Sequence, residues 1–249
     1  MEVFARGQAM SAGAASGSAA EAPAKADPVT IVFDLDGTLV DTAPDLVDTL
    51  NAVFAQEGVP PVPFETARNL IGGGARRMIE LGLKAEGRAC TPAVIQRLFT
   101  GFIAHYSAHI ADRSRPFPAL EAALDSLAAD GAKLAVCTNK LEDLSTKLLA
   151  ALALADRFAA ICGQDTFGLQ KPDPDFLRQT IRRAGGRADR AVMVGDSDAD
   201  IALARATGVP VIAVDFGYTE IPVAELGPDR IISGFDQLPA AVRALAPSG

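Results

Sequence analysis

The sequence has few of the side chains that thiolate or histidine sites need. Its 249 residues include no tryptophan, two histidines and three cysteines. Cys90, Cys137 and Cys162 form no CxxC pair, and the last two stand in apolar, strand-like runs, so we expect buried structural thiols without metal or redox roles. His105 and His109 are four apart on a predicted helix, but no third ligand stands nearby. This pattern predicts an ordinary helix face.

Long apolar runs and an excess of positive charge are also missing. No run approaches the roughly 18 apolar residues of a membrane span. The formal net charge of −8 argues against a nucleic-acid or anionic membrane surface. Residues 1–26 are rich in Ala, Gly and Ser and lack the apolar core of a signal peptide, so we predict a disordered tail, with Met10 as an alternative start. We therefore expect a cytoplasmic monomer or homodimer that binds neither nucleic acid nor membrane.

What the sequence does contain is a regular alternation of strand and helix patterns. Hydrophobic residues make up 49% of the chain, which is enough for a sizeable core. Val29 to Phe33 is a short apolar run typical of a buried parallel strand, and a helical pattern follows from Ala43 to Glu57. The alternation predicts an α/β fold with a doubly wound parallel sheet, a Rossmann-like core. Further predicted strands are 133–137, 191–194, 210–214 and 230–232, with helices near 140–152, 174–184 and 199–206.

One stretch interrupts this alternation. Residues 45–112 keep helical patterns at 67–71, 75–83 and 93–109 but show no convincing strand. A connection of this length is far longer than an ordinary crossover between strands. We therefore predict an inserted helical cap over 45–112 and a catalytic core made of 27–44 and 113–249.

The sharpest local signal is the segment Asp34-Leu35-Asp36-Gly37-Thr38 after the first predicted strand. Ligands of open α/β sheets bind just beyond the carboxyl ends of the strands. Two carboxylates at that place can share a cation while one attacks a substrate and the other transfers a proton. Taken alone, the segment also fits a strand that ends in an Asp-Gly turn.

Three other predicted strand ends or loops carry polar residues. Thr138 and Asn139 follow a strand, where a hydroxyl and backbone N–H groups can hold phosphoryl oxygens. Lys171 precedes a proline and can neutralise phosphate charge. Asp196 and Asp200 are four apart at a helix start and suit a hard cation such as Mg²⁺, whereas Asp198 between them is typical of a capping residue. Each segment alone also fits a helix cap or a solvated surface residue.

Together the four segments, in this order, resemble the motifs of the haloacid dehalogenase superfamily, from Val29 to the C-terminus. The resemblance implies a Mg²⁺-dependent phosphatase with an aspartyl-phosphate intermediate on a small phosphorylated metabolite. The implied roles are nucleophile for Asp34, general acid and base for Asp36, phosphoryl binding for Thr138 and Lys171, and Mg²⁺ ligation by Asp34, Asp196 and the carbonyl of Asp36, with Asp200 in support.

Within the superfamily, the details resemble the phosphoglycolate phosphatase family. The matching segments are DLDGTLVDTAPDL (34–46), IGGGARRMI (71–79), VCTNK (136–140), GQDTFGLQKPDP (163–174) and VDFGYTEIPV (214–223). This resemblance implies hydrolysis of 2-phosphoglycolate to glycolate and phosphate. In the second segment, Gly73 and Arg76 would present backbone N–H groups and a cation to a small carboxylate, and Arg77 is an equal candidate.

Other functions stay open at this stage. Phosphatases for amino-sugar phosphates such as N-acetylmuramate 6-phosphate, pyrophosphatases and β-phosphoglucomutase are neighbouring families. Phosphonoacetaldehyde hydrolases need a cap lysine, and Lys84, the single lysine in 45–112, stands in an unremarkable helical setting. A non-catalytic phosphometabolite-binding domain would be expected to lose Asp34 or Asp36, and a response-regulator-like phosphoacceptor gives no reason for the cap.

Overall fold

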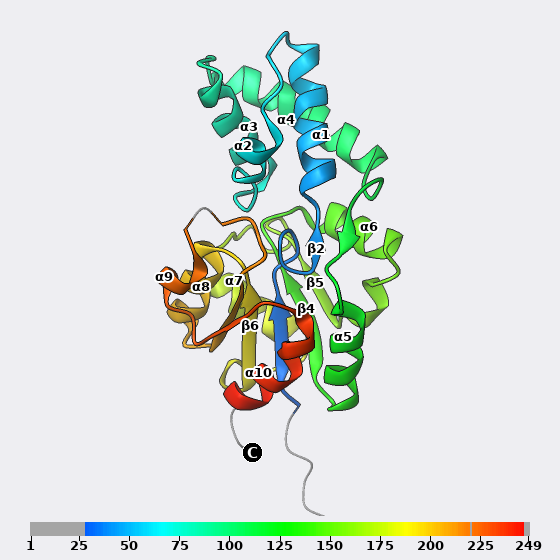
Figure 1. Cartoon of the computed structure of the whole chain (residues 1–249), viewed down its shortest axis with the longest axis vertical. Coiled ribbons are helices and arrows are strands. Elements are labelled where there is room, and N and C mark those ends of the chain that lie inside the picture. The colour runs from blue at the N-terminus through cyan, green and yellow to red at the C-terminus, as the bar shows by residue number, and fades with distance from the viewer. Residues whose placement is uncertain (1–27, 220, 247–249) are drawn as a thin grey trace, which may run out of the picture.

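The computed structural model describes residues 28–219 and 221–246, so the predicted tail (1–26) and the alternative start at Met10 lie outside the described residues. Its centre is a six-stranded sheet in the order β5-β4-β1-β6-β7-β8, and every neighbouring pair is parallel (Figure 1). This arrangement confirms the predicted α/β fold. The strands are β1 (Thr30–Phe33), β4 (Lys133–Cys137), β5 (Ala160–Cys162), β6 (Ala191–Gly195), β7 (Val211–Val214) and β8 (Arg230–Ile232).

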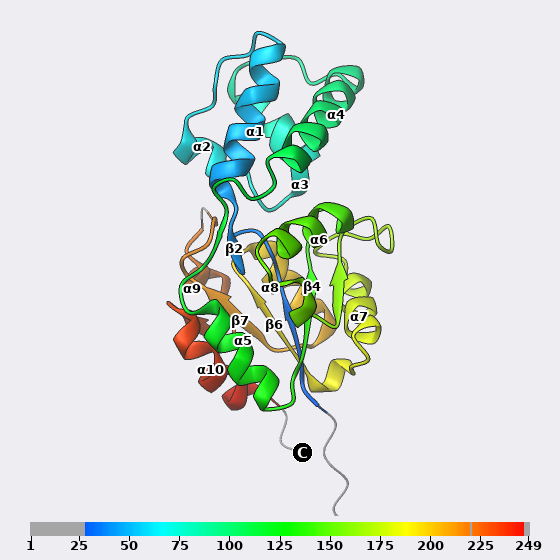
Figure 2. The ribbon, with the colours of Figure 1, turned by 90° about the vertical axis from the view of Figure 1, so that its right-hand side faces the viewer.

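Helices cover both faces of the sheet because successive strand residues point to opposite sides. On one face, Ile31 and Phe33 of β1 pack in a buried cluster with α5 (Leu120–Ala129), α6 (Glu142–Ala151) and α10 (Leu238–Leu245). On the other face, Val32 packs with α7 (Pro174–Arg183), α8 (Asp198–Thr207) and α9 (Val223–Leu226) (Figure 2). Short 3₁₀ turns are η1 (Ala155–Arg157), η2 (Ala188–Arg190) and η3 (Phe235–Gln237).

Strand register brings the polar segments to one edge. Phe33, the last residue of β1, is paired with Val136 of β4 on one side and with Val194 of β6 on the other. The residues that follow these three positions therefore leave the sheet side by side. Because β1 is central and flanked by buried strands, the start of each following loop is held in place by the sheet itself.

Four helices lie above this edge and form a cluster of their own (Figures 1 and 2). Leu50, Phe54, Ile79 and Phe102 are among its buried side chains. This apolar core holds the four helices together, and it also includes Leu144 of α6. None of the helices in the described part of the chain is long and apolar enough to cross a membrane. The four helices are α1 (Ala43–Gln56), α2 (Phe64–Arg68), α3 (Gly74–Ala85) and α4 (Pro92–Ala108).

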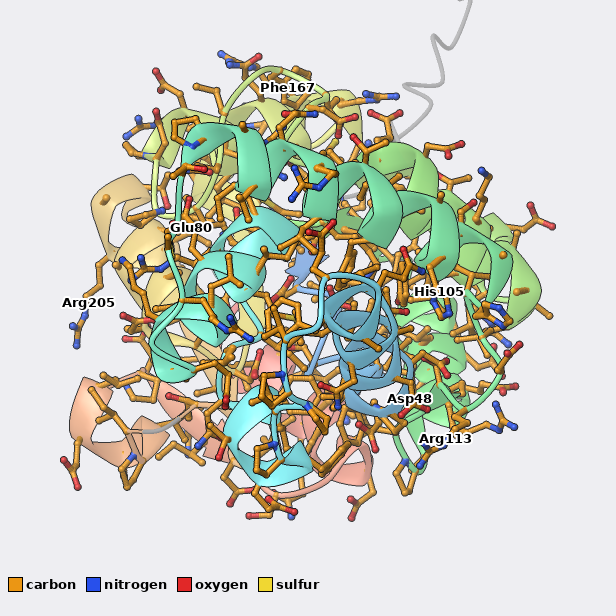
Figure 3. All side chains as sticks on the ribbon, turned by 90° about the horizontal axis from the view of Figure 1, so that it is seen from above. Asp48, Glu80, His105, Arg113, Phe167 and Arg205 are labelled. Atoms are coloured by element: carbon orange, nitrogen blue, oxygen red, sulfur yellow. The ribbon has the colours of Figure 1, made fainter. Side chains whose placement is uncertain are left out.

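Two chain segments join this helical cap to the core. They pair as a short antiparallel ribbon of β2 (Val40–Asp41) and β3 (Arg115–Pro116). The buried carboxylate of Asp45 accepts hydrogen bonds from the backbone N–H groups of Arg113 and Ser114 at 2.8–3.1 Å and from the Ser114 hydroxyl at 2.6 Å. Arg113 also pairs with Asp48 at 2.7 Å, and the two lie together in Figure 3. The domain bounds 45–112 stay a prediction.

Some elements were not predicted from the sequence. Strand β5 and helices α5 and α10 are additional, and α2 begins just after Pro63 and ends at Arg68, earlier than the predicted helical stretch 67–71. Gly72 and Gly74, the latter the first residue of α3, adopt positive φ angles of 110° and 82°, which separate α3 from the turn before it. Cys137 and Cys162 are buried free thiols, as expected.

Candidate active site

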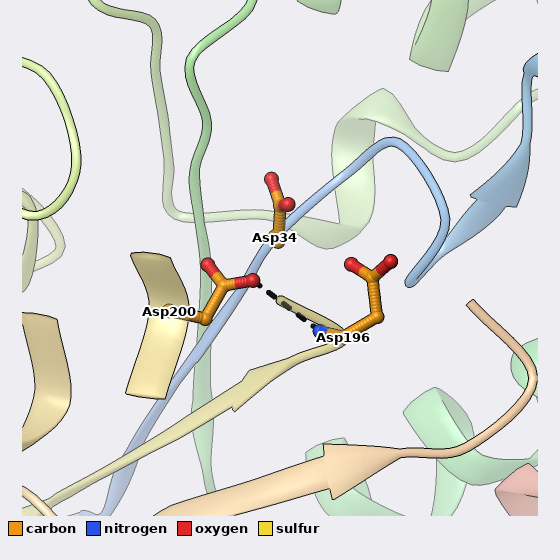
Figure 4. Close-up of side chains that lie close together, drawn as sticks. All are labelled: Asp34, Asp196 and Asp200. Carbon is orange, nitrogen blue, oxygen red and sulfur yellow. Dashed lines mark hydrogen bonds between the residues drawn. The ribbon is translucent and has the colours of Figure 1, made fainter. Parts of the chain in front are cut away.

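Three carboxylates converge at the carboxyl edge of the sheet. Asp34 follows β1, Asp196 follows β6, and Asp200 lies in the first turn of α8. One carboxylate oxygen from each can be chosen so that all three lie within 4.8 Å of one another, and all three residues are buried (Figure 4). The strand ends therefore bring together three of the predicted site residues that are far apart in the sequence.

Lys171 supplies the positive charge inside this cluster. Its ammonium lies 2.8 Å from Asp34 Oδ1 and 2.7 Å from Asp200 Oδ1. Burial alone would lower the pKa of Lys171, but the neighbouring Asp200 and Asp34 outweigh it and hold that pKa above its usual value. Lys171 is therefore a permanent cation between two of the three carboxylates.

One lysine does not balance three carboxylates. Burial raises the pKa of Asp34 to about 8; Lys171 opposes this rise, and Asp200 and Asp196 add to it. Burial, together with the charge of Asp200, also raises the pKa of Asp196 to about 6. A cation bound among these oxygens would relieve the repulsion. Oxygen donors of this kind suit a hard divalent ion such as Mg²⁺, so the residues fit the predicted metal.

Two loops approach Asp196 closely because each has a glycine at the point of contact. Its Oδ1 accepts a hydrogen bond from Thr38 Oγ1 at 2.9 Å and its Oδ2 accepts one from the Tyr218 N–H at 2.8 Å. A Cβ atom added at Gly217 would come within 2.2 Å of Asp196 Cβ, and one at Gly37, whose φ is +83°, within 2.6 Å of Asp196 Oδ2. Both glycines let the loops approach the carboxylate closely.

Two acidic residues in the first turn of α8, Asp198 and Asp200, make different contacts. Ser197 and Asp200 form a capping box, in which Asp200 Oδ2 accepts hydrogen bonds from the N–H and hydroxyl of Ser197 at 3.1 and 2.6 Å. The Asp196 N–H also points at this oxygen, at 3.3 Å. Asp198 is exposed and accepts from the Ala199 N–H at 2.8 Å. Asp198 is thus a local cap outside the cluster, as its spacing indicated.

Asp36 is not one of the three clustered carboxylates and is paired with a different lysine. Both of its oxygens accept from the Lys140 ammonium, at 2.9 and 3.0 Å. On its other side, this ammonium lies 4.5 Å from the ring centroid of Tyr106 in α4. The sequence interpretation gave Lys140 no role, although its place two residues after Thr138, in the same strand-end segment, was a usable signal.

Asn139 connects the site to the cap. Its Oδ1 accepts a hydrogen bond from the Lys171 N–H at 2.8 Å, and its Nδ2 donates to the carbonyl of Gly72 at 3.1 Å. Thr138 is buried, and its hydroxyl accepts from the Lys140 N–H at 3.2 Å. The loop after β4 therefore contacts both Lys171 and the glycine-rich loop of the cap, and it lines the first of the two pockets described next.

Two pockets open between the core and the cap. Asp34, Asp36, Thr138 and Lys140 line the first on the core side, opposite a largely apolar cap wall that includes Tyr106. The second pocket lies beside it and reaches Lys171 and Asp196. Its cap wall includes Gly73 and Arg77.

Arg76 lines neither of these two pockets. Its guanidinium stacks over the Phe99 ring at 4.0 Å and donates to Gln96 Oε1 at 2.7 Å. The structure therefore brings Gly73 and Arg77 to a pocket wall, whereas Arg76 faces other cap residues. Its predicted part in substrate binding stays a prediction.

Comparison with known proteins agrees with this geometry. Residues 31–214 match the family model of the haloacid dehalogenase-like hydrolases. The matched span runs from β1 to the end of β7 and so includes all four polar segments. The chain belongs to this hydrolase family.

Curated relatives narrow the class of hydrolase. The chain is 50% identical over 208 residues to a phosphoglycolate phosphatase of Mesorhizobium japonicum, covering 84% of this chain and 92% of the relative. It is also 50% identical over 216 residues to a phosphoglycolate phosphatase of Caulobacter vibrioides, covering 85% and 90%. A crystal structure described as a predicted phosphoglycolate phosphatase of Haemophilus somnus superposes with a TM-score of 0.80 at 28% identity, over 86% of this chain and 97% of that one. The protein is a phosphoric monoester hydrolase of the haloacid dehalogenase type.

Proposed function

We propose that this protein hydrolyses 2-phosphoglycolate to glycolate and phosphate, that it depends on Mg²⁺, and that Asp34 forms an aspartyl-phosphate intermediate. The substrate follows from the relatives, two of which are 50% identical phosphoglycolate phosphatases. The chemistry follows from the site, where Asp34 lies at the edge of a pocket between core and cap. We place the small phosphorylated metabolite in this pocket, between the core and the cap.

The hydrogen bonds of Asp34 carry the proposal. Its Oδ1 accepts a hydrogen bond from the Leu35 N–H at 2.6 Å and forms an ion pair with the Lys171 ammonium at 2.8 Å. Its Oδ2 receives no hydrogen bond from the described residues. One oxygen is thus fixed in place while the other is free to attack, which is the arrangement an oriented nucleophile requires.

The reaction proceeds in two displacements. Asp34 Oδ2 attacks phosphorus, the bond from phosphorus to the glycolate oxygen breaks, and Asp36 gives its proton to that leaving oxygen. In the second displacement, Asp36 takes a proton from a water molecule that attacks phosphorus, and the bond to Asp34 breaks to release phosphate. Thr138 and Lys171 hold the phosphoryl oxygens during both displacements.

Mg²⁺ would be held by Asp34 and Asp196, with Asp200 beside them and the carbonyl of Asp36 as a further ligand. When bound, it offsets the repulsion between the attacking carboxylate and the phosphate dianion. The raised pKa values of Asp34 and Asp196 support this part of the proposal, because burial and the neighbouring carboxylates raise them further than Lys171 lowers them. Asn139 keeps Lys171 in place through its hydrogen bond to the backbone.

A panel of small phosphoesters tests this function. Purified protein with and without Mg²⁺ is assayed on 2-phosphoglycolate, N-acetylmuramate 6-phosphate, β-glucose 1-phosphate and pyrophosphate. We expect the highest kcat/KM on 2-phosphoglycolate, dependence on Mg²⁺, and loss of turnover in Asp34→Asn. The matched control is Asp143→Asn, which removes an exposed carboxylate of helix α6 outside both pockets and should leave the rate unchanged. Full activity in Asp34→Asn would contradict the mechanism, and a higher kcat/KM on another ester would contradict the substrate.

A further inference from the structure

Lys140 and Tyr106 form a feature that the proposed reaction does not use. Lys140 comes from the loop after β4 and Tyr106 from cap helix α4, and both are buried. The Lys140 ammonium lies 4.5 Å from the centroid of the Tyr106 ring, yet the Tyr106 hydroxyl makes no hydrogen bond with any described residue. A buried hydroxyl without a partner is costly, so its position calls for a ligand.

The surroundings indicate what kind of ligand this is. Both residues line the first pocket, together with Asp34 and Asp36. Lys140 is the single cation among the described residues of that pocket wall, and the cap side around Tyr106 is formed by apolar residues such as Met78, Phe99 and Phe102. A fixed cation beside a free hydroxyl in an apolar wall is suited to a small anion, because low polarity strengthens a charge-assisted hydrogen bond.

We propose that Lys140 and the Tyr106 hydroxyl bind the carboxylate of the substrate while its phosphoryl group lies at Asp34. This proposal rests on the proposed function and names the residues that select a carboxylated phosphoester. A two-carbon ester is short, so a carboxylate attached to it must bind close to the phosphoryl site. Lys140 satisfies this condition, because Asp34 and Lys140 belong to the same pocket.

The ion pair between Lys140 and Asp36 links the binding of the carboxylate to proton transfer by Asp36. Without substrate, both Asp36 oxygens are engaged by the Lys140 ammonium. A carboxylate that binds Lys140 competes with Asp36 for this ammonium and releases it. The released Asp36 is then available for proton transfer to the leaving oxygen. A phosphoester without a carboxylate leaves Asp36 on Lys140, so the exchange favours carboxylated substrates in kcat as well as in KM.

The subsite also joins the two parts of the molecule. Lys140 belongs to the core and Tyr106 to the cap, so an anion between them contacts both at once. Binding therefore favours the arrangement in which the cap covers the pocket. Water exclusion by such closure strengthens the charge interactions at the reacting atoms.

The test compares 2-phosphoglycolate with ethyl phosphate, which has two carbons and no carboxylate. The measured quantity is the ratio of the two kcat/KM values. We expect wild type to favour 2-phosphoglycolate, Lys140→Met to lower the ratio by about 100-fold, and Tyr106→Phe to lower it by about tenfold, in line with loss of a buried charge partner and of one hydrogen bond to a charge. Lys84→Met removes an exposed cap lysine outside both pockets and should leave the ratio unchanged.

The outcomes separate this subsite from the function it rests on. A wild-type enzyme without preference for 2-phosphoglycolate over ethyl phosphate would contradict the proposed substrate, and the subsite with it. A wild-type preference that Lys140→Met and Tyr106→Phe both leave intact would overturn the subsite alone. Equal losses on both esters would assign Lys140 to holding Asp36 only. Collapse of the ratio in Arg76→Met or Arg77→Met instead would place the carboxylate at the cap loop. Tyr106→Phe keeps the test valid if Lys140→Met fails to fold.

Discussion

The two walls of the pocket are built on different physical grounds. The core wall consists of residues at the ends of adjacent parallel strands, and backbone pairing across β4, β1 and β6 fixes their places. Lys171 and the carboxylates around it then form a buried ionic network. The cap wall consists of side chains on packed helices, such as Phe102 and Tyr106, whose directions depend on how those helices pack.

The ionic network of the core and the apolar helix face of the cap should therefore differ in how they tolerate substitution. A network of buried charges is intolerant of change, since removal of one member leaves the others without a partner. An apolar helix face tolerates substitution of similar volume and can be remodelled for another substrate. We therefore expect substitutions in the ionic network around Lys171 to abolish turnover, and cap substitutions to alter the choice of substrate or the stability of the cap.

The largest effect should come from Lys171→Met. The change leaves Asp34 and Asp200 buried without their counter-charge, so we expect a loss of about 3–5 kcal/mol in the free energy of unfolding without Mg²⁺ and turnover reduced by about 10³-fold or more. Denaturant titration and steady-state kinetics measure the two effects. The control Lys147→Met breaks an exposed pair with Asp143 and should change stability by less than about 0.5 kcal/mol. Similar small changes in both variants would show that the buried ionic network contributes no more to stability and turnover than an exposed ion pair.

The connection between the two walls should be the next most sensitive place. Asp45→Ala removes the acceptor for Arg113 and Ser114 where the second connecting segment returns to the core. We expect a loss of about 2 kcal/mol, because hydrogen bonds to a buried charge are lost. Asp48→Ala, one turn away, breaks only an exposed ion pair and should cost no more than about 0.5 kcal/mol. Equal losses from the two changes would contradict the assignment of Asp45 as the tie between the segments.

A smaller effect is expected when a methyl group is added next to the metal site. In Gly217→Ala, the new Cβ would lie 2.2 Å from Asp196 Cβ, so the carboxylate or the loop must move. We expect Mg²⁺ to bind about tenfold more weakly, a loss of about 1.4 kcal/mol, as measured by calorimetric titration. Gly101→Ala in α4 offers a matched cap change, since its Cβ would meet Val53 at an ordinary 3.5 Å. Unchanged Mg²⁺ affinity in Gly217→Ala would show that Asp196 is not a ligand.

The smallest expected effect is the dependence of stability on pH in the absence of metal. The pKa of Asp34 is raised by burial from 3.8 to about 8, so in the folded state this carboxyl keeps its proton in a range where the unfolded chain has lost it. The folded state binds more protons there, and stability without metal should fall as the pH rises from about 4 to about 8. Mg²⁺ should raise the melting temperature more at pH 8 than at pH 5.5, because protons and the cation compete for the carboxylates. A melting temperature without metal that rises over this range would contradict the account.

The core wall could be predicted from the sequence, and the cap wall only in part. The positions of Asp34, Asp196 and Thr138 followed from one rule, that parallel strands end at the same edge. The loop that holds Lys171 has no periodicity; its place before a proline made Lys171 a candidate, and the resemblance to known motifs gave it a role. For the cap, spacing indicated helices but not which of two adjacent side chains, Arg76 or Arg77, reaches a pocket.

Side-chain contacts of Lys140, within the core wall and across to the cap, were beyond sequence reasoning. The pairing of Lys140 with Asp36 joins residues that are 104 positions apart, and Tyr106 approaches Lys140 only because α4 packs on α1 and α3. In the sequence, Tyr106 looks like any aromatic residue on an amphipathic helix. Such contacts depend on helix packing, for which strand order and residue spacing give no rule.

The most direct test of the account is the covalent state of Asp34. Enzyme with Mg²⁺ is mixed with excess 2-phosphoglycolate, quenched in acid within milliseconds, digested and examined by mass spectrometry. We expect one phosphoryl group on the peptide that contains Asp34, present only during turnover, and no such peptide in Asp34→Asn. Turnover with no phosphorylated Asp34, together with substantial activity in Asp34→Asn, would contradict the account.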